Sequence, residues 1–279
     1  MDESKHTQLP NTQDLFSVKG RVALVTGGTS GIGYAMAEGL LRGGARVYIC
    51  SRKENKCNEA VESLSKLGEC IAIAADISDK EQRKRLVDTL FSKELQGLSI
   101  LINNAGSNWG APIEEYPDDA FEKVMRVNVN SVFALTRDLL PLLEKAGTAE
   151  SPARVINIGS MDALQVPIVS RVPTFAYSAS KAALHHLTET LAVDLGPRNI
   201  TVNAIAPGFF ESKMTDVVLD KFGKDIEDEC PLGRIGRPSD IVGVMQFLAS
   251  QAGAYVNGAI LPVDGGTHIS KGRREWMQR

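Results

Sequence analysis

Short runs of aliphatic and β-branched residues alternate with amphipathic segments along most of this 279-residue chain. The runs VALV, ILIN and VINI are apolar at nearly every position, whereas a strand with one solvated face would alternate apolar and polar residues. Strands that are buried on both faces belong to parallel sheets covered by helices on each side. The sequence therefore predicts an α/β fold: a single doubly wound parallel sheet of about seven strands with helices on both faces, of the Rossmann type.

The expected elements follow one another without a linker or an internal repeat. Strands are expected at about 22–28, 46–51, 69–78, 98–106, 153–160, 200–208 and 259–266, and helices at about 32–45, 53–67, 80–95, 118–145, 175–195, 214–228 and 238–250. We expect one catalytic domain over residues 20–269. Residues 1–19 are expected to form a flexible arm that is too polar to pack, and residues 270–279 a C-terminal tail.

Composition excludes several classes of protein. The chain is 43% hydrophobic and has a formal net charge of -3, which is too apolar for a disordered chain and too evenly charged for a nucleic-acid-binding protein. No apolar stretch approaches the roughly 18 residues that a membrane-spanning helix needs, and the N-terminal segment lacks the apolar core of a secretory signal. We expect a cytoplasmic protein with neither a nucleic acid nor a membrane as partner.

The cysteines and histidines do not predict a metal site. The four cysteines form no CxxC pair, and Cys50 lies in an apolar run that is typical of a buried structural thiol. His185 and His186 are adjacent in a predicted helix and so point to different sides, and the HExxH pattern is absent. We expect no metal.

A glycine-rich loop follows the first predicted strand. Residues 26–33 read TGGTSGIG, a G-x-x-x-G-x-G spacing that permits a tight turn and lets a pyrophosphate approach the N-terminus of the next helix. No Lys-Ser/Thr pair follows the last glycine, so the loop is not a P-loop. A tight turn without a ligand is the alternative. The dinucleotide-binding interpretation assigns the loop residues Gly27, Thr29, Ser30, Gly31, Ile32 and Gly33 to the cofactor.

The end of the second strand indicates which dinucleotide is bound. NAD-binding proteins carry an acidic residue there that holds the ribose 2′-hydroxyl, but this chain has Ser51 and Arg52. The guanidinium of Arg52 is suited to a 2′-phosphate, and no carboxylate stands beside it to repel one. A solvated Arg52 is the alternative, and for Lys53 we favour that interpretation. The sequence predicts NADP(H) as the cofactor.

Tyr177 and Lys181 are four residues apart in a predicted helix and so share one face. A free tyrosine titrates near pH 10, and burial alone would raise that pKa further. A neighbouring ammonium would favour the phenolate, so the pair is suited to general acid–base chemistry near neutral pH. The alternative is an ordinary pair on a helix surface.

Further polar groups are expected at the same edge of the sheet. Ser160 ends the strand VINIGS, the motif Asn-Asn-Ala-Gly at 103–106 ends the fourth strand, and Asn128 lies in the following helix. In open α/β sheets, ligands bind at the carboxyl ends of the strands. These groups therefore belong to one candidate site together with the glycine loop and Tyr177.

These motifs resemble the short-chain dehydrogenase/reductase family from about Gly20 to Ile269. The family pattern T-G-x-x-x-G-x-G matches residues 26–33, N-N-A-G matches 103–106 and Y-x-x-x-K matches 177–181, and further matches are Asp76, Pro207-Gly208 and Asp264-Gly265-Gly266. Within the family, the chain looks most similar to NADPH-dependent 3-oxoacyl reductases, including those linked to bacterial rhamnolipid synthesis.

The resemblance implies a catalytic tetrad. Tyr177 would protonate the substrate carbonyl oxygen, Ser160 would hydrogen-bond that oxygen, and Lys181 would hold the nicotinamide ribose and lower the pKa of Tyr177. Asn128 would position a water that passes protons to Lys181. The resemblance also assigns further residues to the cofactor: Asp76 and Ile77 to the adenine, Asn104, Ala105 and Gly106 to the ribose, and Pro207, Gly208 and Phe209 to the nicotinamide amide.

The chain departs from the family pattern between Ser160 and Tyr177, where residues 161–176 form a longer segment than expected. This segment is apolar and contains prolines, so we expect it to form one wall of the substrate cleft. Met161 is a candidate within this segment, and Trp109, Phe209, Phe210 and Met214 are expected to form other walls, with ordinary core packing as the alternative for each. Residues 209–230 are expected to form a mobile lid.

The sequence thus predicts an NADP(H)-dependent carbonyl reductase that acts on a ketone, a β-ketoester or a 3-oxoacyl thioester to give a secondary alcohol. Two alternatives stay open: a non-catalytic NADP(H)-binding sensor, and a related alcohol dehydrogenase that works mainly in the oxidative direction. The resemblance also implies a homotetramer, or a homodimer.

Overall fold

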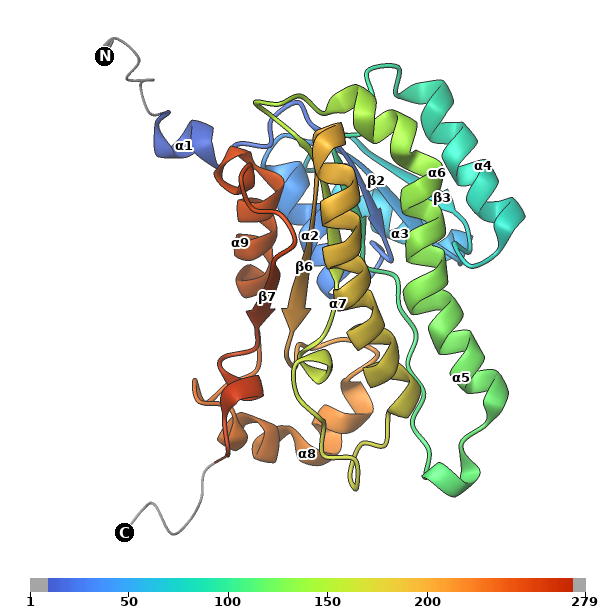
Figure 1. The fold of residues 1–279 in the computed structure, drawn as a ribbon, viewed down its shortest axis with the longest axis vertical. Helices are drawn as coiled ribbons and strands as arrows, with labels where there is room; N and C mark the ends of the chain where they lie inside the picture. The colour runs from blue at the N-terminus through green and yellow to red at the C-terminus, as the bar shows by residue number, and fades with distance from the viewer. Residues whose placement is uncertain (1–9, 273–279) are drawn as a thin grey trace.

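The computed structural model describes residues 10–272. Its centre is a seven-stranded sheet in the order β3-β2-β1-β4-β5-β6-β7, and all neighbouring strands run parallel. Helices cover both faces of this sheet (Figure 1). The predicted single doubly wound sheet is confirmed.

The elements agree with the expected ranges except at their ends. The strands are β1 (Val22–Thr26), β2 (Arg46–Ser51), β3 (Cys70–Ala74), β4 (Ile100–Asn103), β5 (Ala153–Ile158), β6 (Ile200–Pro207) and β7 (Ile260–Val263). The α-helices are α1 (Thr12–Leu15), α2 (Gly31–Arg42), α3 (Glu54–Leu64), α4 (Lys80–Lys93), α5 (Asp118–Met125), α6 (Ser131–Ala146), α7 (Phe175–Leu195), α8 (Asp216–Glu229) and α9 (Pro238–Ala249). Short 3₁₀ turns at Ile113–Glu115, Met161–Ala163, Gly196–Arg198, Gln251–Gly253 and Thr267–Ile269 complete the described chain.

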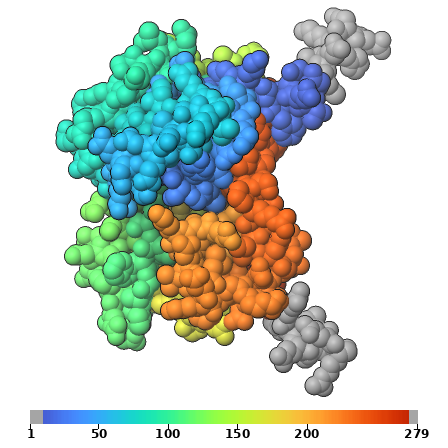
Figure 2. Space-filling view, turned by 180° about the vertical axis from the view of Figure 1, so that it is seen from behind, coloured from blue at the N-terminus to red at the C-terminus, as the bar shows by residue number. Residues whose placement is uncertain are grey.

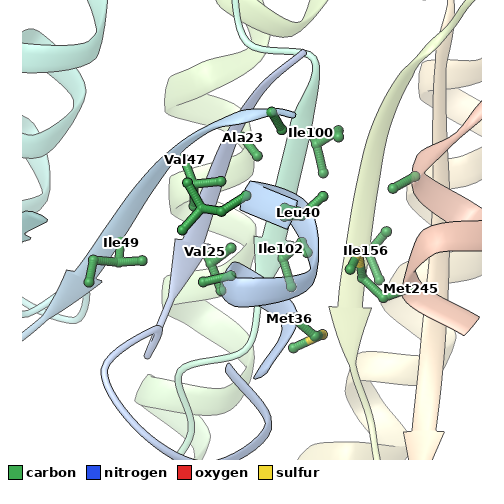
Figure 3. Close-up of a cluster of buried hydrophobic side chains, with 14 of the residues drawn as sticks. Ala23, Val25, Met36, Leu40, Val47, Ile49, Ile100, Ile102, Ile156 and Met245 are labelled. Atoms are coloured by element: carbon green, nitrogen blue, oxygen red, sulfur yellow. The ribbon is translucent and has the colours of Figure 1, made fainter. Parts of the chain in front are cut away.

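Alternate residues of each strand pack into two separate cores. Ala23 and Val25 of β1 face a core that includes α2 and α9, whereas Leu24 faces the opposite core with α4 and α6. Figure 3 shows the first of these cores around Val25 and Leu40 of α2. Both faces of β1 are therefore buried, which is why its sequence carries no polar alternation.

The order of the strands changes direction between β1 and β4. From β1 the chain proceeds outward to β2 and β3, then returns to place β4 on the other side of β1, where Ala23 pairs with Ile100. The loops after β1 and β4 therefore diverge and leave a crevice at the carboxyl ends of the strands. In Figure 1 this edge of the sheet faces α8.

The helix expected over 118–145 contains a π-helical turn. Residues Arg126–Asn130 form this wider turn between α5 and α6. π-Turns inside α-helices occur frequently at functional sites, because the extra residue redirects the side chains around it. Here the turn carries Asn128, one of the four predicted catalytic residues.

The prediction for the N-terminal end of the domain needs correction. Residues 1–19 do not form an unpacked arm throughout, because Val18 is fully buried in the core and the side chain of Gln246 in α9 donates a hydrogen bond to the carbonyl of Phe16. At the other end, the first residues of the predicted tail, 270–272, line a cavity. Residues 1–9 and 273–279 lie outside the described residues.

Within residues 10–272, no helix is long and apolar enough to cross a membrane. No group of three or more His, Cys, Asp or Glu side chains in the same range is arranged to hold a metal ion. All four cysteines are buried free thiols. Burial raises the pKa of the Cys50 thiol to about 12, so this group is a neutral core residue, as its sequence context predicts.

Candidate active site

The glycine loop has the backbone shape that its sequence predicts. Gly27 and Gly31 have positive φ angles of 66° and 56°, a region that side-chain-bearing residues rarely adopt. At Gly33, a Cβ atom would lie 2.3 Å from Nδ2 of Asn104 and 2.4 Å from the carbonyl oxygen of Gly27, so only glycine fits. Helix α2 begins at Gly31, and no side chain caps its free N–H groups, which leaves them available to an anion.

Hydrogen bonds join the glycine loop to the end of β4. The hydroxyl of Thr26 accepts bonds from the backbone N–H groups of Asn104 and Ala105, both at 3.0 Å. In return, Nδ2 of Asn104 donates to the carbonyl of Thr26 at 2.9 Å. The two loops at the change of strand order are therefore held in a fixed relation, in part by the amide nitrogen of Asn104.

A groove of about 690 Å³ runs along this edge of the sheet. It brings together every predicted cofactor residue except Phe209, and its lining includes Gly27, Thr29–Gly33, Ser51, Arg52, Asp76, Ile77, Asn104–Gly106, Tyr177, Lys181, Pro207 and Gly208. Phe209 lines the adjoining cavities instead. In Figure 2 the surface of the N-terminal part, in blue, lies directly above the orange surface of the segment that follows β6.

The Arg52 side chain is exposed at one end of this groove. Within residues 10–272, no hydrogen bond or ion pair engages its guanidinium, while the nearby carboxylate of Asp76 accepts bonds from the N–H and hydroxyl of Ser78. Lys53 does not line the groove. The groove thus combines a glycine cradle at a helix N-terminus with an available cation directly after β2, and these features fit a dinucleotide with a phosphate on its ribose.

Ser212, Lys213 and Thr215 also line this groove, although the sequence analysis assigned them no individual role beyond their place in the predicted lid segment 209–230. They lie in the segment after β6 and approach the glycine loop, where a Cβ on Gly31 would lie 3.2 Å from Cβ of Ser212. Their position shortly after Pro207-Gly208 was the signal available in the sequence. No local sequence pattern shows that a segment will cross a groove.

Three predicted catalytic residues meet where this groove joins a second cavity. Ser160 follows β5, and Tyr177 and Lys181 lie one turn apart on α7. The Lys181 ammonium is 5.5 Å from the centroid of the Tyr177 ring and donates a 2.6 Å hydrogen bond to the carbonyl of Ile158. The Ser160 hydroxyl lies beside Tyr177, where it favours the phenolate, and it accepts a 3.1 Å bond from the backbone N–H of Asp162. The Tyr177 phenol and the Ser160 hydroxyl therefore both line the junction of the groove and the second cavity.

The pKa of Tyr177 differs in direction from the sequence expectation. Burial and the negative charge of Asp162 raise this pKa to about 12, and only the Ser160 hydroxyl opposes them. Lys181 does not lower it, because burial reduces the pKa of Lys181 itself to about 8 and its ammonium is directed at Ile158. In this state of the protein, Tyr177 is a protonated donor.

Asn128 contributes to the site through its neighbours. Its amide is buried, with Nδ2 donating to the carbonyl of Ser107 and to the hydroxyl of Ser180, both at 2.9 Å, and Oδ1 accepting from the N–H of Ser107 at 2.8 Å. This side chain therefore fastens the loop after β4 to α7.

His185 lies behind Ser160 and was assigned no role by the sequence analysis. Its Nε2 accepts a hydrogen bond from the backbone N–H of Ser160 at 3.4 Å, and a Cβ on Gly159 would lie 2.0 Å from the same nitrogen. Burial and the Lys181 charge lower the pKa of His185 to about 4, so the ring is neutral. His185 thus supports the turn that presents Ser160, at a position four residues beyond Lys181 that no catalytic motif marks.

A cavity of about 380 Å³ adjoins Ser160 and Tyr177. The segment 161–174 and helix α8 form two of its walls, and its lining includes Met161, Asp162, Gln165, Val166, Ile168, Phe209, Met214, Val218 and Phe222. Met161 and Met214 thus lie where they were predicted. Trp109 lines the groove rather than this cavity, and Phe210 packs into the core against Gly236, so neither is a wall of the cavity.

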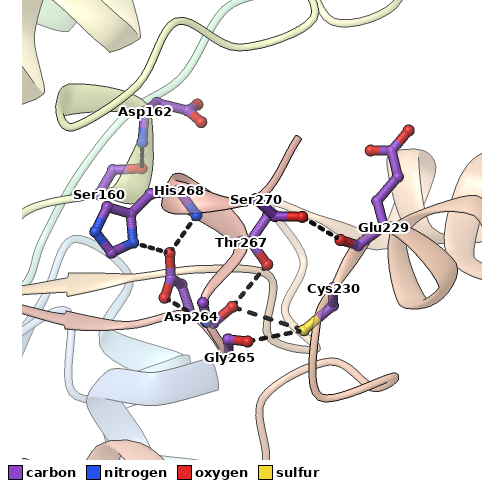
Figure 4. Close-up of polar contacts among 10 residues, drawn as sticks. Ser160, Asp162, Glu229, Cys230, Asp264, Gly265, Thr267, His268 and Ser270 are labelled. Atoms are coloured by element: carbon purple, nitrogen blue, oxygen red, sulfur yellow. Dashed lines mark hydrogen bonds and ion pairs between the residues drawn. The ribbon is translucent and has the colours of Figure 1, made fainter. Parts of the chain in front are cut away.

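The two walls of the cavity meet at its mouth. Arg171 forms a 3.1 Å ion pair with Asp225 of α8 and lies over the ring of Phe222 at 5.5 Å. Both charged groups are more than half exposed, and α8 itself has no fully buried residue. The turn after β7 contributes Thr267 to the lining of the cavity. Within this turn, the Asp264 carboxylate accepts the backbone N–H of His268 and contacts its ring (Figure 4).

Replacing Asp162 by Asn is expected to lower the pKa of Tyr177, because the negative charge at this position raises it. If Tyr177 is the acid–base group that the sequence predicts, the rate of alcohol oxidation should reach half of its maximum at a lower pH in the variant. Initial rates across a pH series measure this shift. Glu229 lines the same cavity without acting on this pKa, so Glu229→Gln is the control. An unshifted profile for Asp162→Asn would remove Asp162 from the electrostatics of the site.

A family model described as enoyl-(acyl carrier protein) reductase matches residues 27–268. A rhamnolipids biosynthesis 3-oxoacyl-[acyl-carrier-protein] reductase of Pseudomonas aeruginosa is 46% identical over 256 residues, which are 91% of this chain and 98% of that protein. A tropinone reductase homologue of Arabidopsis thaliana is 34% identical and covers 93% of this chain and 96% of its own length.

Solved structures agree with these sequence matches. The Pseudomonas aeruginosa RhlG/NADP active-site complex superimposes with a TM-score of 0.87 at 45% identity, over 91% of this chain and 99% of the other. A Burkholderia cenocepacia gluconate 5-dehydrogenase in complex with NADP and tartrate reaches 0.84 at 30% identity, over 91% and 98% of the two chains. The similarity extends over the whole domain and confirms the family resemblance. The chain belongs to the short-chain dehydrogenase/reductase family of oxidoreductases.

Proposed function

We propose that this protein is an NADPH-dependent carbonyl reductase that converts a ketone, a β-ketoester or a 3-oxoacyl thioester into a secondary alcohol. The observation that carries the proposal is the convergence of Ser160, Tyr177 and Lys181 at the junction of the groove and the cavity. A cofactor in the groove and a carbonyl compound in the cavity would meet at these side chains. The names and NADP complexes of the relatives support the same chemistry.

Bound NADPH would supply the hydride to the carbonyl carbon. The chain's own groups then act on the carbonyl oxygen: the Ser160 hydroxyl donates a hydrogen bond to it, and the Tyr177 phenol delivers the proton. The high pKa of Tyr177 keeps this phenol protonated and ready to donate at neutral pH. The buried Lys181 ammonium would hold the ribose hydroxyls and orient the cofactor.

The test is turnover of a panel of ketones, β-ketoesters and 3-oxoacyl thioesters with NADPH, followed by absorbance at the nicotinamide band. We expect alcohol formation from at least one class. NADPH binding without oxidation across the whole panel would instead favour a non-catalytic sensor. Faster oxidation of the product alcohols with NADP⁺ would favour the related alcohol dehydrogenase.

Replacing Arg52 by Ser is expected to reduce the preference for NADPH over NADH by about ten- to a hundredfold, the effect of losing a hydrogen bond to a charged group. The ratio of kcat/KM for the two cofactors measures it. Lys53→Ser is the matched control, because Lys53 neighbours Arg52 but lies outside the groove. An equal loss in both variants would show that general surface charge, and not Arg52, selects the cofactor.

We also propose that the protein is a homotetramer, or a homodimer, in the cytoplasm. Exposed apolar side chains on α5, α6 and α7 support an assembly through these helices, since Phe121, Phe133 and Val193 are 40%, 43% and 80% exposed. Four unpaired thiols support a reducing compartment. Light scattering on the purified protein measures the assembly, and a monomeric mass at micromolar concentration would contradict it.

A further inference from the structure

The carboxylate of Asp162 faces the substrate cavity without a partner. Asp162 lies two residues beyond Ser160, in the short 3₁₀ turn Met161–Ala163, and it lines the cavity next to Tyr177. Its backbone N–H donates to Ser160, but no hydrogen bond or ion pair engages its carboxylate among the residues that the structure describes. Figure 4 shows this side chain pointing away from Ser160.

The other charged groups of the cavity do not compensate this carboxylate. Arg171 is paired with Asp225 at the mouth, and Glu229 carries the same charge as Asp162. Lys271 lines the cavity beyond α8 but forms no ion pair with Asp162. Burial alone raises the pKa of Asp162 to about 6, a further sign that no cation stabilises its charged form.

Local structure does not require a carboxylate at this position. The turn is held by the backbone N–H of Asp162, a contact that any residue except proline can make. A partly buried carboxylate without a partner is unfavourable, because it loses hydration and gains no compensating bond. Such a group is typical of a ligand-binding position, where the ligand completes its hydrogen bonds.

We propose that Asp162 is a substrate-recognition residue that accepts a hydrogen bond from a hydroxyl or amide N–H group close to the reducible carbonyl. This inference rests on the proposed reductase function. Ser160 would contact the carbonyl oxygen, and Asp162 lines the same cavity two residues further along the chain. The donor therefore belongs near the carbonyl, and the first and second carbons beyond it are the positions to test. A carboxylate at that place would be repelled, whereas a purely aliphatic chain would leave Asp162 unpaired.

Two pairs of ketones of equal size test the proposal. 2-Hydroxyacetophenone is compared with propiophenone, and 3-hydroxypropiophenone with butyrophenone, so that each pair exchanges a hydroxyl for a methyl group. The readout is the ratio of kcat/KM within a pair, compared between wild type and Asp162→Ala. The intrinsic reactivity of each ketone cancels in this comparison. We expect the ratio to fall at least about tenfold in one pair.

The control variant is Asp225→Asn, which removes a carboxylate from the same cavity that is already engaged by Arg171. It should keep the wild-type ratio. If Asp162→Ala does not fold, Asp162→Asn replaces it and should lower the ratio by a smaller factor, because a neutral acceptor forms a weaker bond. An unchanged ratio in both pairs would overturn the proposal.

Binding measurements separate this inference from the proposed function. The affinities of both ketone pairs are measured by calorimetry for the NADPH complex of Tyr177→Phe, with and without Asp162→Ala. If the hydroxyketones bind more tightly than their methyl counterparts only when Asp162 is present, but the wild type turns over none of them, the recognition role is supported and the reductase function is rejected. Turnover without such a preference in rate or binding would retain the reductase and reject the role of Asp162.

Discussion

Replacing Tyr177 by Phe is expected to lower ketone turnover with NADPH by about 10²–10⁴-fold, the usual contribution of a positioned general acid. The substitution removes one oxygen atom and keeps the ring that lies beside Lys181. The bond from Lys181 to Ile158 does not involve the phenol oxygen and remains. The loss should therefore appear in kcat, with little change in the dissociation constant of NADPH. Steady-state kinetics and a cofactor titration measure the two quantities.

Tyr255→Phe is the matched control, because the side chain of Tyr255 is fully exposed and lines neither the groove nor the cavity. This variant should retain wild-type turnover. Unchanged ketone turnover in Tyr177→Phe would show that another group donates the proton. A loss confined to NADPH affinity would instead assign Tyr177 to cofactor binding alone.

The second large effect is expected at Gly33, where an added methyl group has no space. Its Cβ would lie 2.3 Å from Nδ2 of Asn104 and 2.4 Å from the carbonyl oxygen of Gly27, so either the backbone of the loop or the amide that joins it to β4 must move. Overpacking of this kind typically reduces the free energy of unfolding by about 1–3 kcal/mol. Because the displaced atoms form the cofactor cradle, we expect Gly33→Ala to weaken NADPH binding by at least about tenfold.

Gly243→Ala is the control for this substitution. Gly243 lies within α9, and nothing stands within 4 Å of the position that its Cβ would occupy. Alanine favours helix over glycine by up to about 1 kcal/mol, so this variant should be as stable as the wild type or more stable. Chemical denaturation and NADPH titration of both variants measure the difference. Tight NADPH binding by Gly33→Ala would contradict the assignment of the loop to the cofactor.

The fold and the cofactor groove could be predicted because their signals are local in the chain. Strands that are apolar on both faces, such as β1 and β5, predict a parallel sheet covered by helices. Gly27 and Gly31 have positive φ angles and Gly33 has no room for a Cβ atom, so each of these positions requires glycine. The carboxyl ends of parallel strands must then meet at one edge. That geometry brings Ser160 to the groove without any knowledge of the loops.

Other features depend on contacts between distant segments. Phe210 and Met214 are both apolar residues after β6, yet one packs into the core and the other lines the cavity, because the path of the loop decides which way each points. The position of His185 behind Ser160 depends on how α7 crosses β5. The pKa of Tyr177 differed for the same reason, since the sequence pattern shows Lys181 but not the burial of the site or the approach of Asp162.

The walls of the cavity contribute little to the core on which folding depends. Helix α8 has no fully buried residue, and in segment 161–174 only Met161 and Thr174 are buried, whereas both large cores lie on the faces of the sheet. Substitutions on these walls therefore have small effects on stability, typically within about 0.5 kcal/mol at exposed positions. New substrate preferences can accumulate there by mutation while the sheet, the glycine loop and the proton donor stay as they are. A library restricted to residues 164–172 and 214–226 would explore specificity with few misfolded members.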